Sequence, residues 1–294
     1  WALTLLLSVA LYGSHAPLLA LCKVDGAIPF SSAAVVVLVE LTKLAASLLL
    51  LLLPRGERRC PSWRHGAAFA LPALLYAASN NLAVHMQLFM DPSTFQVLSN
   101  LKIVSTALLY SLLLRRGLGG RRWLGLLLLL AAGLSYSWGG LRTPGSPAGR
   151  QLHITPRGLL LLALYCFVSG LAAVYTEAVL KAQELPLSLQ NLFLYSFGVL
   201  FNGLGYLWSG AQGGFLRGFS PGVLLVVASQ ALNGLLMSVV MKHSGSITRL
   251  FVIACSMLAN ALLSVALFQL QLTLLFCLAA CCVALALHLY YGAP

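Results

Sequence analysis

Ten long apolar runs, separated by short loops rich in charged residues, glycine and proline, dominate this sequence. A helix needs about 20 apolar residues to cross a bilayer, and it satisfies its backbone polar groups internally. We therefore expect an all-α membrane protein with about ten transmembrane helices. The runs cover residues 2–22, 31–53, 66–89, 93–114, 122–141, 157–181, 187–210, 220–241, 246–268 and 271–291.

The composition excludes a soluble protein. Only 8% of the 294 residues are charged, whereas soluble domains carry about 25%. The mean hydropathy of +0.92 agrees. This chain has too few charges to cover a water-facing surface, which excludes a soluble enzyme, a disordered chain and a disulfide-stapled secreted domain.

The basic residues predict how the chain is oriented. Positively charged loops stay in the cytosol. Loops after even-numbered runs hold nine Lys and Arg residues, and loops after odd-numbered runs hold five, so we expect both termini to be cytosolic. The net charge of +12 also favours an anionic cargo, while the lack of a basic helix face argues against nucleic acid.

The longest loop, 142–156, divides the runs into two groups of five. We expect two five-helix repeats, residues 1–145 and 146–294. An odd number of spans places such halves in opposite orientations, which is a common transporter plan. A short echo between 78–82 and 228–233 supports this arrangement.

Lys102 is the most informative polar residue because it lies in the middle of the fourth run. A lysine at mid-membrane costs at least about 2.5–3.5 kcal/mol on insertion scales, so it should face a wet cavity or a charged partner. With Gln96 and Ser99 at three-residue spacing, it forms a polar stripe that suits a substrate path. The alternative is a structural ion pair with Glu40.

Two further pairs of opposite charge stand at helical spacing. Glu40 and Lys43 are three residues apart, and Glu177 and Lys181 are four apart. Such neighbours can form local ion pairs. A structural role is the simpler interpretation, and a role in gating is the alternative.

Amide and aromatic side chains recur in the third, seventh and eighth runs. Asn and Gln can join one helix to another, but together with a lysine they could also bind a base, a ribose and a phosphate. Arg249 could bind phosphate or a lipid headgroup. No nucleotide-hydrolysing, metal-binding or catalytic motif occurs, so we expect neither an enzyme nor a cofactor. The candidate substrate-binding residues here are Tyr76, Asn81, Asn191, Tyr195 and Asn233.

The segment 95–103 resembles the Tyr-Gln-Val-x-Tyr-Gln-Leu-Lys-Ile motif of nucleotide-sugar transporters, in the subfamily of the CMP-sialic acid and UDP-galactose carriers. Segments 76–81, 174–181, 191–195, 238–242 and 270–273 are similar to other motifs of that subfamily. The resemblance implies a drug/metabolite-transporter fold in the Golgi membrane. It also implies an antiporter that exchanges a cytosolic nucleotide sugar for a nucleoside monophosphate.

By the same resemblance, Lys102 and Lys242 would hold phosphate, and Tyr76, Asn81, Asn191 and Tyr195 would contact nucleotide or sugar. This sequence departs from the family pattern at four positions near the supposed site. Phe95 lacks the hydroxyl group of the family's Tyr, and Phe197 stands in place of a small polar residue. They leave the cargo open between a UDP-sugar and a CDP-linked polyol such as CDP-ribitol. The departures are Phe95, Ser99, Asn100 and Phe197.

A rival interpretation is a non-transporting membrane scaffold or regulator of related carriers. The expected partners are the lipid bilayer, the nucleotide sugar and the monophosphate. Homo- or hetero-oligomers with related transporters stay open.

Overall fold

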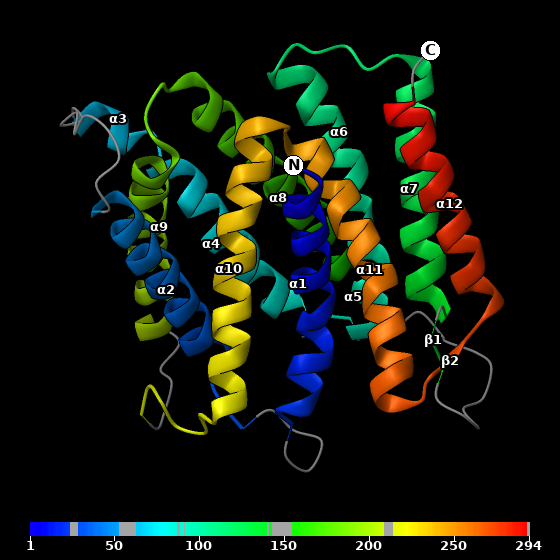
Figure 1. The fold of residues 1–294 in the computed structure, drawn as a ribbon, viewed down its shortest axis with the longest axis horizontal. Helices are drawn as coiled ribbons and strands as arrows, with labels where there is room; N and C mark the ends of the chain where they lie inside the picture. Colours follow the sequence, from blue (N-terminus) through cyan, green and yellow to red (C-terminus); the bar gives the residue numbers. More distant parts are fainter. Residues whose placement is uncertain are drawn as a thin grey trace.

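The computed structural model is a bundle of helices (Figure 1). It describes residues 1–23, 29–52, 63–86, 89–90, 92–139, 141–142, 155–208 and 214–292. The helices are α1 (Ala2–Leu21), α2 (Ser32–Leu52), α3 (Trp63–Ala67), α4 (Ala70–Met86), α5 (Pro92–Leu98), the 3-10 turn η1 (Ser99–Leu101), α6 (Lys102–Leu113), α7 (Gly120–Gly139), α8 (Pro156–Ala182), α9 (Leu187–Trp208), α10 (Pro221–His243), α11 (Ser246–Phe268) and α12 (Leu274–Tyr291). Two short strands, β1 (Leu141–Arg142) and β2 (Gln271–Leu272), pair antiparallel.

Helix occupies all ten predicted ranges, and the expectation of an all-helical, multi-pass membrane protein is confirmed. Within the described residues, seven helical segments are long and apolar enough to cross a membrane. The three predicted ranges that hold α4, α7 and α9 are not among these seven segments. α4 has only 17 residues, and polar residues near one end of α7 and along α9 lower their hydropathy.

Two of the long helices, α8 and α10, begin with the same sequence pattern, a hydroxyl residue followed by proline. Thr155 caps α8 by accepting a hydrogen bond from the amide of Gly158 at 3.1 Å, and Ser220 caps α10 through Val223 at 3.4 Å. Proline follows each cap at the first helical position. A side-chain oxygen satisfies an otherwise unpaired helix amide, and proline has no amide to satisfy there.

The fourth predicted span is helical throughout, and its segment Thr94–Leu113 is one of these seven. Its helix changes to the 3-10 turn η1 for three residues just before Lys102. The Asn100 side chain accounts for this turn, because it donates to the carbonyl oxygens of Gln96 and Val97, each at 3.0 Å. A side-chain amide that bonds to its own backbone competes with the regular helix pattern. It also donates to Gly133 of α7.

The outer surface is apolar and the interior is partly polar. Leu3, Leu160 and Leu274 are 77%, 75% and 84% exposed, whereas Glu177 and Gln190 are fully buried. A water-soluble protein shows the reverse distribution. This arrangement suits a bundle that is surrounded by lipid and keeps its hydrogen-bonding groups inside.

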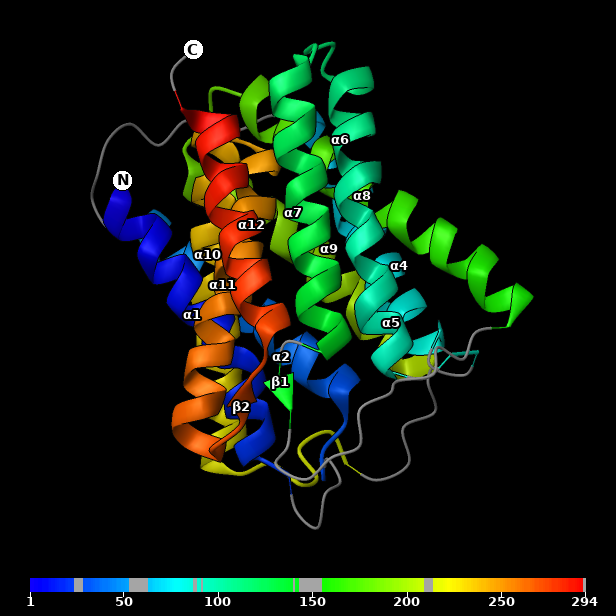
Figure 2. The ribbon, with the colours of Figure 1, turned by 90° about the vertical axis from the view of Figure 1, so that its right-hand side faces the viewer.

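Eight helices pack in a closed cycle of neighbours. The order is α1, α10, α2, α9, α4, α8, α6 and α11, after which the cycle returns to α1. The remaining long pair, α7 and α12, packs side by side outside this ring, against α6 and α11 (Figure 2). The strands β1 and β2 join the ends of this outer pair.

The packing pattern has an internal symmetry. The same neighbours result when each helix of the first half is exchanged with its counterpart in the second half. The counterparts are α1 and α8, α2 and α9, α4 and α10, α6 and α11, and α7 and α12. Close approaches follow the same rule. Gly13 of α1 packs tightly on α11 near Ala259, and Gly170 of α8 packs tightly on α6 near Thr106. Without a side chain, glycine allows two helix backbones to come close.

α1 begins and α12 ends on the same side of the bundle (Figure 1). We call this the termini side. The other side, where β1 and β2 lie, is called the opposite side.

Candidate functional site

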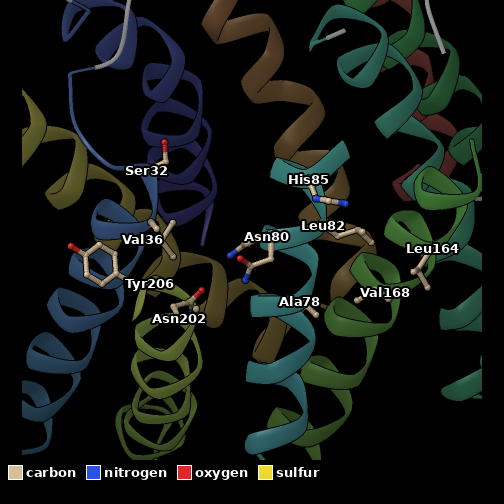
Figure 3. Close-up of a pocket in the computed structure, with 13 residues that line it drawn as sticks. Ser32, Val36, Ala78, Asn80, Leu82, His85, Leu164, Val168, Asn202 and Tyr206 are labelled. Atoms are coloured by element: carbon tan, nitrogen blue, oxygen red, sulfur yellow. The ribbon is translucent and has the colours of Figure 1, made fainter. Parts of the chain in front are cut away.

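A cavity of about 780 Å³ opens between α2 and α9 on one wall and α4 and α8 on the other (Figure 3). Its lining includes the first residues of α2 and the last turns of α4 and α9, so it lies on the opposite side. Pockets of about 300–1,000 Å³ commonly hold small molecules. The lining residues are Ser32, Ala33, Val36, Ala78, Asn80, Asn81, Leu82, His85, Leu164, Val168, Asn202, Gly205 and Tyr206.

The polar groups of this cavity are uncharged hydrogen-bonding groups and one imidazole. Asn81, a predicted substrate contact, donates to the Ala77 carbonyl at 2.8 Å. Asn202 donates to the Gly198 carbonyl at 2.8 Å. These bonds fix the two amides on facing walls. Within the described lining, no lysine, arginine or carboxylate is present.

An ion pair lies below the cavity. The Lys43 ammonium is 2.5 Å from a Glu40 oxygen, and their side chains are only 11% and 15% exposed. The ammonium also lies 4.4 Å from the centre of the Tyr195 ring. Glu40 therefore pairs with Lys43 and not with Lys102, the partner considered from the sequence.

Tyr195 and Asn191 are buried on α9, where they hold α10. The Tyr195 hydroxyl donates to the Gly234 carbonyl at 3.3 Å, and the Asn191 amide donates to Ser238 at 2.8 Å. The Asn191 side-chain oxygen is buried without a hydrogen-bond partner among the described residues. Both residues serve helix packing in this conformation, and Asn191 retains an unused acceptor.

Tyr76 and Arg249 connect α4 to α11. Arg249 donates to the Tyr76 hydroxyl at 2.6 Å, and its guanidinium carbon lies 5.5 Å from the centre of that ring. Arg249 is partly buried, and its Nε atom has no partner within the described residues. Since this side chain points into the protein, its contacts do not suit a lipid headgroup.

Glu177 and Lys181 form a second ion pair, at 2.6 Å, on the termini side. Glu177 also accepts hydrogen bonds from the backbone amide and the hydroxyl of Ser246, at 2.6 and 2.7 Å. Lys181 donates to the Ser244 carbonyl at 2.9 Å. The pair therefore holds the sharp turn between α10 and α11, where Gly245 has a φ of +139°.

Lys242 lies near that turn and joins α10 to the start of α9. Its ammonium donates to Gln190 at 2.9 Å and to the carbonyl oxygens of Gln183 and Leu185 at 3.3 and 3.2 Å. In this conformation Lys242 does not line the cavity. Its bonds close the termini side.

Lys102 lies along a small crevice between η1, α6, α7 and α11, apart from the large cavity. The crevice volume is about 10 Å³, which is room for about one water molecule. Among the described residues its ammonium has no hydrogen-bond or ion-pair partner. Ser99, one turn earlier, donates to the Gln96 carbonyl at 3.1 Å. Lys102 is thus a half-buried cation without a partner in the part of the chain that the structure describes.

Asn233 is buried on α10, and its side-chain oxygen has no partner within the described residues. The Ser229 hydroxyl, one turn earlier, is likewise unpaired. Next to them, Gln230 lies within hydrogen-bond distance of His15 of α1, at 2.9 Å. Among the described residues, α10 therefore carries two unused polar groups that lie one turn apart.

Four cavity residues were missed as candidates from the sequence. Ser32, His85, Asn202 and Tyr206 stand at or near helix ends, where polar residues usually face water and indicate no site. A usable signal was present in α9, because Asn202 and Tyr206 follow Asn191 and Tyr195 by 11 residues each, which is about three helical turns.

Comparison with known proteins identifies the family. The nucleotide-sugar transporter family model matches residues 19–291. This chain belongs to that family. It is also 60% identical to the probable UDP-sugar transporter SLC35A4 of pig, and the match covers 99% of this chain and 94% of the relative.

Two other relatives of this transporter carry the same name. The human protein is 58% identical, with 99% of this chain and 94% of the relative covered. The zebrafish protein is 51% identical, with 99% and 93% covered. A crystal structure of a protein only 14% identical superposes with a TM-score of 0.75, over 98% of this chain and 94% of that chain. That likeness shows the fold alone.

Proposed function

We propose that this member of the family is an antiporter that exchanges a nucleotide sugar for a nucleoside monophosphate. The observation that carries the proposal is the asymmetry of the interior. A large cavity, with mostly apolar walls and a few uncharged polar groups, lies on the opposite side, while bonds from Lys181, Lys242 and Arg249 close the termini side. A carrier stopped at one end of its cycle has this form.

Alternating access would come from two inverted repeats, residues 1–145 and 146–294. Ten transmembrane spans follow when α4, α7 and α9 also cross the membrane, with α5, η1 and α6 counted together as one span. The internal symmetry of the packing supports this plan. Exchanging the conformations of the two halves would move the cavity from α4 and α8 to the equivalent pair, α10 and α1.

The proposed substrate contacts divide between the two ends of this cycle. Asn81 faces the cavity now. Asn191 and Asn233 have unused oxygen atoms in the closed part of the bundle, and Lys242 would be released when its bonds to α9 break. Tyr76 now bonds to Arg249 and Tyr195 to Gly234. Ser99 lies one turn before Lys102, which would supply a positive charge for phosphate. Glu177 and Lys181 would act as a gate on the termini side.

We place the termini side in the cytosol and the cavity toward the Golgi lumen. The excess of basic residues in the loops of the termini side supports the orientation. The resemblance to Golgi carriers supports the compartment. In this assignment the structure is open to the lumen, ready to bind the outgoing monophosphate.

The cargo is proposed to be a pyrimidine nucleotide sugar. The relatives named probable UDP-sugar transporters favour a UDP-sugar. Phe95 packs its ring against Tyr165, with 5.4 Å between ring centres, and Phe197 packs against Phe201 at 6.2 Å. Phe95 and Phe197 thus make apolar contacts where the family pattern has polar side chains. For this reason a CDP-linked polyol such as CDP-ribitol is the other cargo to test.

A second function is favoured by one observation. The described lining of the cavity lacks the lysine or arginine that a diphosphate would require. A scaffold or regulator of related carriers needs no such group, and it would form homo- or hetero-oligomers with them.

Reconstitution into proteoliposomes separates the two functions. Vesicles loaded with UMP or CMP should take up the matching UDP-sugar or CDP-ribitol faster than empty vesicles. Lys102→Ala should abolish this exchange while expression and thermal unfolding stay close to wild type. If loaded vesicles with the wild-type protein take up every cargo no faster than empty vesicles do, the result would favour the scaffold.

A further inference from the structure

The Glu40–Lys43 pair lies directly beneath the floor of the cavity. Glu40 is one helical turn beyond Val36, which lines the cavity on α2. Gly198, against which Glu40 packs, is one turn before Asn202, which lines it on α9. Residues four apart share a helix face, so the pair lies on the cavity side of both helices. Of the ion pairs between described residues, this one has the shortest separation along the chain from a cavity-lining residue.

Two glycines make room for the pair. A methyl group on Gly198 would come within 2.6 Å of a Glu40 oxygen, and one on Gly234 would come within 2.7 Å of the Lys43 side chain. The ammonium is also set over the Tyr195 ring, a contact that attracts a cation whether or not a carboxylate is present. The lysine therefore has a fixed position of its own.

Glu40 is held far less firmly than the other paired glutamate. Lys43 is its sole hydrogen-bond partner among the described residues. Glu177, by contrast, binds Lys181 and also the amide and hydroxyl of Ser246. A carboxylate with a single partner can be displaced by another anion, whereas one with three partners is fixed in the structure.

The pair also lies where the two halves meet. The internal symmetry exchanges α2 with α9, so the contact between these two helices is unchanged when the two halves are exchanged. A position between these helices keeps its place when the cavity moves from α4 and α8 to α10 and α1. Lys43, which already touches Gly234 of α10, would be reached from both cavities.

We propose that Lys43 receives the phosphate of the cargo and that Glu40 occupies Lys43 when the site is empty. This inference rests on the proposed transport function and names a further residue for it. The incoming phosphate displaces the carboxylate, which turns toward the water of the cavity one turn away. Competition by Glu40 lowers phosphate affinity, so the cargo can leave after the carrier has changed sides.

Opposite changes in phosphate affinity are the signature of this exchange of partners. Binding of UMP and uridine, with CMP and cytidine alongside, is measured on the purified full chain in detergent. Lys43→Met should weaken monophosphate binding by more than about tenfold, the effect of losing a charged hydrogen bond, and leave nucleoside binding unchanged. Glu40→Gln should strengthen monophosphate binding several-fold. A purely structural pair would make both variants bind more weakly.

Two further variants keep the test decisive. The double variant Glu40→Gln with Lys43→Met has no unpaired buried charge, so it should fold even where Lys43→Met does not. Its preference for the monophosphate over the nucleoside should still be weaker than that of wild type by more than about tenfold. Arg217→Met is the control, because it removes an exposed positive charge to which no role in the cycle is assigned. It should not alter the preference for the monophosphate over the nucleoside.

The outcomes separate this inference from the proposed function. Wild-type protein that binds no pyrimidine nucleotide and exchanges none would overturn both. Wild-type protein that exchanges nucleotides, with the double variant still preferring monophosphate as strongly as wild type, would overturn only the role of Lys43. Equal weakening by Glu40→Gln and Lys43→Met would assign the pair a structural role and overturn the inference as well.

Discussion

Arg249 of α11 donates a 2.6 Å hydrogen bond to the hydroxyl of Tyr76 on α4. The two residues come from different halves of the chain, and α4 and α11 are not neighbours in the ring of helices. The bond therefore crosses the interior from one wall to the other. It stands among the contacts that keep the termini side closed.

We predict that Tyr76→Phe destabilises this conformation. The guanidinium would lose its oxygen acceptor in a partly buried site, and hydrogen bonds to charged groups contribute about 1.5–3 kcal/mol. Thermal unfolding in detergent should show the loss. The matched control is Tyr175→Phe, since the Tyr175 hydroxyl has no hydrogen-bond partner among the described residues. Equal unfolding temperatures for the two variants would contradict the prediction.

Gly198 should be intolerant of even one added methyl group. Gly198→Ala would force Glu40 away from its place, and overpacking of this kind typically costs about 1–3 kcal/mol. Gly203, on the same helix, has open space where its side chain would lie. Gly203→Ala should therefore keep or raise the unfolding temperature, because alanine favours helix. A stable Gly198→Ala protein would show that the space beside Glu40 is larger than the structure indicates.

The sequence predicts the helices well because each one is an uninterrupted apolar run between clear breakers. It also places Glu40 beside Lys43 and Glu177 beside Lys181, since helical spacing alone brings each pair together. These are local relationships. They depend on residues three or four positions apart, so they need no knowledge of the fold.

Relationships between distant helices could not be predicted in this way. Nothing near Asn202 in the sequence indicates that it faces Asn81 across a cavity. The 3-10 turn before Lys102 was not predicted, because it depends on Asn100 fitting against Gly133, which belongs to another helix. The position of Lys102 beside a small crevice, apart from the large cavity, likewise depends on how α6, α7 and α11 pack.

Asn100 provides a test of that 3-10 turn. Its amide donates to Gln96, Val97, Gly133 and Ser137. Asn100→Ala would remove these bonds and leave a gap against α7, and we expect a loss of about 1–3 kcal/mol in the free energy of unfolding. It should also reduce exchange, because Lys102 directly follows the turn. Asn80→Ala, which changes an exposed amide, serves as the control for stability. Similar unfolding temperatures for both variants would argue that Asn100 does not stabilise the turn.

The cavity itself can be tested by filling it. Gly205 lines the cavity, and a methyl group there would lie 3.6 Å from the Asn81 amide, an ordinary contact. Gly205→Leu should therefore fold normally while its side chain occupies space that the cargo needs. Gly203→Leu adds the same side chain two residues away, where nothing lies within 4 Å, and it should leave transport unchanged. Nucleotide exchange in proteoliposomes should fall at least about tenfold for Gly205→Leu alone, a barrier increase of about 1.4 kcal/mol. If both variants exchange nucleotide at the wild-type rate, the cargo does not pass through this cavity.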